Sequence, residues 1–185
     1  MNLKKAIEEF LPINKQEIKD KEMFLYYLKN FDDVLTRSNE IVHFTSSAFV
    51  LNKSRNKVLM IYHNIYNSWG WTGGHADGDS DLLQVALREV TEETGVNNVK
   101  PIISDIFIID TLSVLGHEKK GKYIPAHIHL SVAYLFEADE TETLLIKEDE
   151  NSNVKWIPIE EVVEHSTEPH MKIVYEKIIN KIKVV

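Results

Sequence analysis

The chain has 185 residues, of which 43% are hydrophobic and 27% charged, a balance that supports one domain with a hydrophobic core. Its 29 acidic and 21 basic residues give a formal net charge of -8, which argues against a broad basic surface for nucleic acid. The absence of cysteine excludes disulfides, thiolate nucleophiles and cysteine-based zinc sites. No apolar run is long enough for a signal peptide or a bilayer span, so we expect a cytoplasmic protein without membrane contact.

The N-terminal part of the chain has helical periodicity. Residues 3–10 and 15–30 are predicted to be helices, and Pro12 separates them. The texture changes near Ile41, so we assign residues 1–40 to an N-terminal helical extension and residues 41–185 to the main domain.

Strand-like and helix-like segments alternate in the main domain. This pattern predicts a mixed α/β fold (α+β in arrangement), with a mixed β-sheet flanked by helices. The predicted strands are 41–52, 57–64, 100–115 and 127–138. The predicted helices are 82–94, 159–166 and 168–183, and loops or connections cover 67–80 and 140–158.

The helix at residues 82–94 has the clearest boundaries in the chain. Asp81 is a suitable N-cap, and Gln84 three residues later completes a capping-box pattern. Gly95 is suited to the left-handed residue that follows a helix. We therefore expect this helix to begin after Asp81 and to end near residue 94.

Three glutamates occupy the C-terminal half of that helix. Glu89, Glu92 and Glu93 have i, i+3, i+4 spacing, which places them on one face, and Arg88 offsets part of their repulsion. The helix dipole disfavours anions at this end. A solvated acidic face is one interpretation. The other is a bound cation, because carboxylate oxygens suit Mg²⁺ or Mn²⁺.

Two histidines alternate onto one face of the predicted strand 127–138. His127 and His129 could form half of a zinc site, but the sequence indicates no third ligand. A pair that contacts the sheet face or a substrate is the favoured interpretation.

The stretch from Gly74 to Val96 resembles the Nudix box, which reads Gly, five residues, Glu, seven residues, then Arg-Glu-apolar-x-Glu-Glu-x-Gly-apolar. Every fixed position matches except one, where Ser80 replaces the first glutamate. The segment WGWTGGH before it resembles the usual entry into the box, with Thr72 in place of the frequent proline. Glu150 precedes Trp156 by six residues, as a metal-binding glutamate does in the nucleotide-sanitising bacterial (MutT) member.

The resemblance implies an α/β/α sandwich and a hydrolase of nucleoside diphosphates linked to another group, with Mg²⁺ or Mn²⁺ as cofactor. It implies that Glu89 is the general base and a metal ligand, and that Arg88 orients the carboxylates. The other implied metal ligands are Glu92, Glu93, the Gly73 carbonyl and Glu150, with Glu148 and Asp149 as competitors of Glu150.

The substrate and the oligomeric state stay open, a homodimer included. The expected partner is a small nucleoside diphosphate derivative, without nucleic acid. Candidate substrate-binding residues are Trp69, Trp71, His75, His127 and His129. One alternative is a catalytically weakened, ligand-sensing module, which the Ser80 substitution suggests. Another is isopentenyl-diphosphate isomerase, which the missing cysteine disfavours.

Overall fold

A computed structural model describes residues 3–119 and 121–184. Residues 1–2 of the predicted extension and residues 120 and 185 of the predicted main domain lie outside the described part. The chain forms two compact units, and β1 (Val42–Asn52), β9 (His127–Ala138) and helix α3 (Leu82–Thr94) contribute residues to both. Among the described residues, the first unit comprises 3–47, 73–85, 105–119 and 121–134, and the second comprises 48–72, 86–104 and 135–184.

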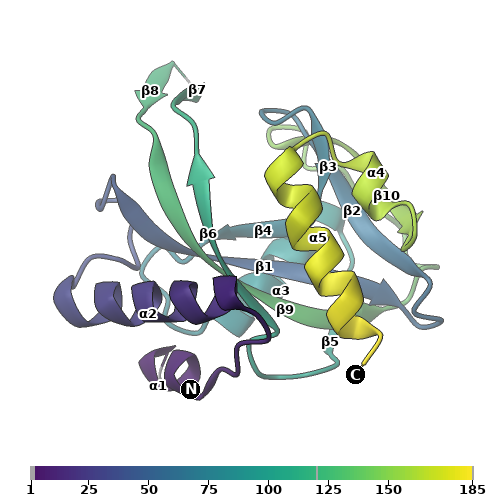
Figure 1. Cartoon of the computed structure of the whole chain (residues 1–185). Helices are drawn as coiled ribbons and strands as arrows, with labels where there is room; N and C mark the ends of the chain where they lie inside the picture. The colour runs from purple at the N-terminus through teal and green to yellow at the C-terminus, as the bar shows by residue number, and fades with distance from the viewer. Residues whose placement is uncertain (1–2, 120, 185) are drawn as a thin grey trace. The chain divides into compact units, whose positions relative to one another are not determined.

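The first unit begins with two helices, α1 (Leu3–Glu9) and α2 (Lys15–Asn30), which confirm the predicted helical extension. The side chain of Asn14 caps α2 by accepting from the Glu17 amide at 2.8 Å. Helix α2 packs across β6 (Ile108–Val114), as Figure 1 shows. Asp20 holds it there by accepting from the Thr111 amide at 2.9 Å.

The strands of the first unit centre on β9. Strand β6 pairs with it antiparallel, from Ile108 opposite Ala133 to Val114 opposite His127. The Ile128 amide donates to the Ile41 carbonyl at 2.9 Å at the start of β1. Beyond β6 and β9, β7 (His117–Lys119) and β8 (Lys122–Ile124) form a hairpin that the sequence did not predict (Figure 1).

In the second unit, β2 (Lys57–His63) lies between two longer strands. It pairs antiparallel with the end of β1 and with β10 (Asn151–Pro158). The short strand β3 (Ser68–Gly70) also pairs with β2, and β5 (Lys100–Pro101) pairs with the end of β9.

The sequence predictions for one connection, one loop and one strand were wrong. The predicted connection 140–158 ends in β10. Its first residues are polar and follow an acidic segment, so the sequence pattern indicated a connection and not a strand. The predicted loop 67–80 contains β3 and β4 (Thr72–His75). The predicted strand 100–115 is divided into β5 and β6, because residues 102–107 form a bend between them.

The predicted C-terminal helices are confirmed as α4 (Val162–His165) and α5 (Pro169–Ile182). The buried Tyr175 anchors α5, since its ring lies 6.4 Å from that of Phe49 and its hydroxyl accepts from the Trp71 amide at 3.1 Å. Among the described residues, no helix has both the length and the apolar character needed to cross a membrane.

Helix α3 has the predicted boundaries, but its N-terminal cap differs in one respect. The Gln84 amide donates to the Asp81 carboxylate at 3.3 Å, as expected. The Asp81 amide donates to the Asp79 carboxylate at 2.9 Å, so an aspartate of the preceding loop takes the part that the capping box gives to Gln84. At the other end, Gly95 has a φ of 77°, and an added Cβ would lie 2.7 Å from Leu145.

Candidate active site

The acidic end of α3 faces a lysine from the loop before β10. Lys147 Nζ lies 3.0 Å from a Glu150 carboxylate oxygen and 3.6 Å from a Glu92 oxygen. Arg88 also approaches Glu92, at 3.9 Å along the helix. An ammonium group therefore lies between two carboxylates, in the position that a cation would favour.

Glu89 is half-buried beside this pair. Burial raises the pKa of its carboxyl group, and the neighbouring charges of Glu92 and Glu150 raise it further. Lys147 and Arg88 act in the opposite direction on the same pKa. Glu89 consequently holds a proton more tightly than an exposed glutamate, which suits a group that accepts a proton during a reaction.

The three glutamates differ in exposure, although the sequence predicts one shared face. Glu92 is exposed, whereas Glu93 is only 3% exposed. The backbone carbonyl of Glu93 accepts from the Asn151 side chain at 3.2 Å, which fixes the end of α3 to the start of β10. Asn151 is itself fully buried, and its Oδ1 atom has no hydrogen-bond partner among the described residues.

The three acidic residues of the loop before β10 differ in how far their side chains are exposed to solvent. Glu148 and Asp149 are exposed, while Glu150 is half-buried and contacts Lys147. This arrangement favours Glu150 over its two neighbours as a metal ligand. Sequence reasoning missed Lys147, and the available signal was that it is the only basic residue between positions 139 and 150.

Gly73, directly before the box, and Ser80 within it lie in the first unit. A Cβ at Gly73 would lie 2.6 Å from Ser47 Oγ and 2.8 Å from the Ser46 carbonyl, so β1 leaves room only for glycine. This packing accounts for the glycine without a metal, and a ligand role for its carbonyl stays a prediction. Ser80 is exposed in the loop before α3.

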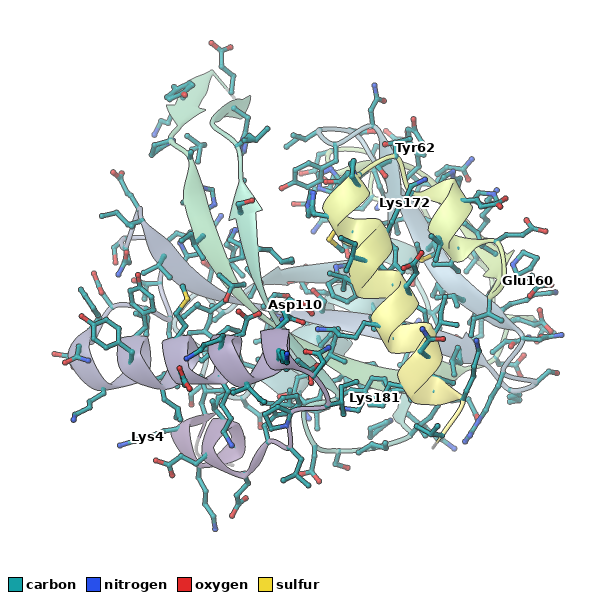
Figure 2. All side chains as sticks on the ribbon, in the orientation of Figure 1. Lys4, Tyr62, Asp110, Glu160, Lys172 and Lys181 are labelled. Atoms are coloured by element: carbon teal, nitrogen blue, oxygen red, sulfur yellow. The ribbon has the colours of Figure 1, made fainter. Side chains whose placement is uncertain are left out.

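The two predicted tryptophans belong to the second unit. Lys155 Nζ lies 4.5 Å from the ring centroid of Trp69, and Tyr62, labelled in Figure 2, packs edge-on against the same ring at 5.4 Å. Trp71 packs edge-on against the buried Tyr175 at 5.7 Å, which gives it a structural contact. Substrate binding by either tryptophan stays a prediction.

The three predicted histidines lie together in the first unit and are joined by a fourth, His43 of β1. One ligand nitrogen from each of His43, His75, His127 and His129 lies within 4.8 Å of the others. The sequence prediction lacked a third ligand because His43 and His75 are on other strands, and only the folded sheet brings them to His127 and His129.

The chain matches the NUDIX domain family over residues 42–178. It is 30% identical to an RNA pyrophosphohydrolase of Pelagibacter ubique (strain HTCC1062) over 139 residues, which are 72% of this chain and 87% of that protein. It is also 30% identical over 128 residues to an RNA pyrophosphohydrolase of Bartonella bacilliformis, covering 62% of this chain and 74% of the relative. Among solved structures, a C. elegans Ap4A hydrolase shares the fold with a TM-score of 0.53 and 17% identity, over 76% of this chain and 95% of that one.

The chain therefore belongs to the Nudix family, as the box from Gly74 to Val96 predicted, and it has the mixed α/β fold of that family. It is a Nudix pyrophosphohydrolase, a hydrolase that acts on phosphoanhydride bonds. The isomerase alternative is thereby set aside. Members of the family typically depend on a divalent metal ion and act on diphosphate compounds.

Proposed function

We propose that this Nudix pyrophosphohydrolase hydrolyses a nucleoside diphosphate linked to another group, by attack of water on phosphorus in the presence of Mg²⁺ or Mn²⁺. The observation that carries the proposal is the group of carboxylates around Lys147, with Glu92 at 3.6 Å, Glu150 at 3.0 Å and Glu89 close enough to be influenced by both acids.

The donor set suits a hard divalent cation. Glu89, Glu92 and Glu150 repel one another, and the positive charges of Lys147 and Arg88 offset part of that repulsion. Carboxylate oxygens are the ligands that Mg²⁺ prefers, usually together with water and substrate phosphates. With Glu93 as a further ligand, these residues would hold the ion, which would neutralise the diphosphate and polarise a phosphoryl oxygen.

Glu89 is the proposed general base. A carboxylate oxygen of Glu89 accepts a proton from the attacking water, and its raised pKa brings it closer to the operating pH than an exposed glutamate. Arg88 has a positioning role, since it lies 3.9 Å from Glu92 and limits the orientations of that carboxylate.

Trp69 is the residue proposed to stack against the nucleoside base. Its half-buried ring offers a flat surface for stacking, and Lys155 beside it provides a positive charge for a phosphate. Trp71, His75, His127 and His129 are the remaining predicted substrate-binding residues.

A second candidate substrate is the 5′ end of RNA, because both relatives carry the name RNA pyrophosphohydrolase. The net charge of -8 favours a small molecule, since a long RNA would be repelled by most of the acidic surface. Only the terminal phosphates would then contact the enzyme.

A panel of substrates tests the proposal. Nucleotide sugars, dinucleotide cofactors, nucleoside triphosphates and 5′-triphosphorylated RNA would be assayed with Mg²⁺, then with a chelator, in water labelled with ¹⁸O. We expect turnover of one small-molecule class, loss of turnover in the chelator, and ¹⁸O in a phosphate product. Full turnover in the chelator would contradict the mechanism, and binding without turnover would favour the sensing alternative.

A further inference from the structure

The four histidines of the first unit form a second polar cluster, and the proposed proton transfer and hard-cation binding use none of them. They come from three strands: His43 from β1, His75 from the end of β4, and His127 and His129 from β9. We propose that these four imidazoles bind one divalent transition-metal ion, with Zn²⁺ as the first candidate, in addition to the hard cation proposed at the glutamates.

The backbone fixes which nitrogen two of the rings present. His43 Nδ1 lies 2.9 Å from the Asn39 carbonyl oxygen, and His127 Nδ1 lies 2.8 Å from the Pro125 carbonyl oxygen. A carbonyl oxygen only accepts, so each Nδ1 carries the hydrogen and each neutral ring has a lone pair on Nε2. Metal-binding histidines are commonly oriented by such a hydrogen bond from the second nitrogen.

Those lone pairs meet the other rings of the cluster. His127 Nε2 lies 3.0 Å from His129 Nε2, and since His127 can only accept there, His129 donates in the metal-free state. His43 Nε2 is buried and has no hydrogen-bond partner among the described residues. Leaving a buried acceptor unsatisfied is unfavourable, and coordination of a cation would remove that cost.

Two of the four rings, His43 and His129, are kept neutral near pH 7 by their surroundings. Burial lowers the pKa of His43. The pKa of His129 is lowered to about 2, mainly by burial and further by the charges that His75, His43 and His127 could carry. The charges of Arg37 and Asp77 near His43 oppose each other, and the two residues are paired at 2.8 Å. Neutral imidazoles can bind a cation without first losing a proton.

The nitrogen-only donor set selects the class of metal. Imidazole suits Zn²⁺, Cu²⁺ and Ni²⁺, whereas Mg²⁺ and Ca²⁺ prefer oxygen. Tetrahedral Zn²⁺ with Zn–N bonds of about 2.0–2.1 Å requires nitrogen atoms about 3.3 Å apart. The Nε2 atoms of His127 and His129 are 3.0 Å apart, and all four ligand nitrogens lie within 4.8 Å of one another. These distances lie on either side of the required value, so small side-chain rotations would complete the site. His75 and His129 are half-buried, which leaves them within reach of an entering ion.

Calorimetric titration of the chelator-treated full chain with Zn²⁺ tests the proposal, with millimolar Mg²⁺ present to occupy the glutamates. We expect one equivalent of Zn²⁺ to bind, and Co²⁺ in its place to give the visible absorption of a tetrahedral nitrogen site. His127→Gln and His129→Gln should each weaken binding at least tenfold. His170→Gln is the matched control, because His170 is outside the cluster and half-exposed, and it should bind as the wild type does.

Nuclear magnetic resonance of the wild-type chain with ¹⁵N-labelled histidine makes the test independent of the variants' folding. Zn²⁺ should shift the ring nitrogens of four histidines together, and His129 should move its hydrogen from Nε2 to Nδ1. Absence of a shift in these rings would overturn the proposal and leave a metal-free imidazole cluster. Equal Zn²⁺ affinity in the folded cluster variants and the wild type would overturn it too.

Discussion

The ammonium group of Lys147 lies 3.0 Å from the carboxylate of Glu150, three residues along the same loop. Lys147 also reaches Glu92 of α3 at 3.6 Å, so it ties the loop to the helix that carries the box. Its ammonium group thus offers one positive charge to both acids. A divalent ion would therefore compete with Lys147 for the same oxygens.

Replacement of Lys147 should strengthen metal binding. Lys147→Gln removes the competing charge, and the Mg²⁺ concentration at half-maximal activity should fall about two- to fivefold, as expected for a partly exposed pair worth about 0.5–1 kcal/mol. Lys53→Gln is the control, because Lys53 is exposed and pairs with Asp139 at 2.6 Å instead. An unchanged midpoint in Lys147→Gln would show that the metal does not use these acids.

Alanine at Gly73 should destabilise the fold. Its Cβ would meet the Ser46 carbonyl at 2.8 Å and Ser47 Cα at 2.9 Å, and overpacking against backbone costs about 1–3 kcal/mol. Gly70→Ala is a matched control, since its Cβ would meet only the Tyr175 hydroxyl, at 3.6 Å. Urea denaturation followed by circular dichroism measures both. Equal stability of the two variants would mean that the backbone of β1 moves to make room for a Cβ at Gly73.

Glutamate at Ser80 should have a small effect. Ser80 is exposed in the loop before α3, where Asp79 and Asp81 already form the cap, so Ser80→Glu should change kcat/KM modestly and leave the Mg²⁺ midpoint unchanged. Ser80→Gln controls for side-chain size. A tighter midpoint would identify a lost ligand, and a gain of ~10²-fold, about 2.7 kcal/mol, would show that the natural protein is a weakened enzyme.

Glu168 should make stability depend on pH. Burial raises the pKa of this carboxyl group in the folded state, and the neighbouring His170 only partly opposes the shift. Ionisation is then easier in the unfolded chain, so stability is lost as pH rises from the unfolded pKa of about 4.3 through the higher folded value. Glu168→Gln should be more stable than wild type at pH 7 but not at pH 3.5. Glu168 directly precedes α5, and Glu176→Gln, at an exposed position of α5, is the control that should show no such difference.

The sequence predicted the features that depend on local spacing. Helix α3 and its ends follow from Asp81 and Gly95, and the box follows from fixed positions within 23 residues. The strand β10 was missed because its first residues, Asn151 to Asn153, are polar and follow an acidic segment. Its strand character comes from pairing with β2, which no local pattern reveals.

The parts of the two clusters that sequence reasoning missed depend on long-range contacts. Lys147 meets Glu92 across 55 positions of the chain, and His43 joins His127 across 84. Residue type indicated that Glu92 and His127 could bind a cation. Only the pairing of strands and the return of the loop before β10 determine which other side chains lie within reach.

The turnover of Glu89→Gln at saturating Mg²⁺ tests the proposed hydrolysis, with Glu89 as general base, most directly. Glutamine keeps the size of the side chain but cannot accept the proton, so kcat should fall by ~10²–10⁴-fold while the circular dichroism spectrum and the thermal transition stay near those of the wild type. Glu8→Gln, on the exposed surface of α1, should leave kcat unchanged. A folded Glu89→Gln enzyme with near-normal kcat would contradict the assignment of the general base, and Glu150 would be the next residue to replace.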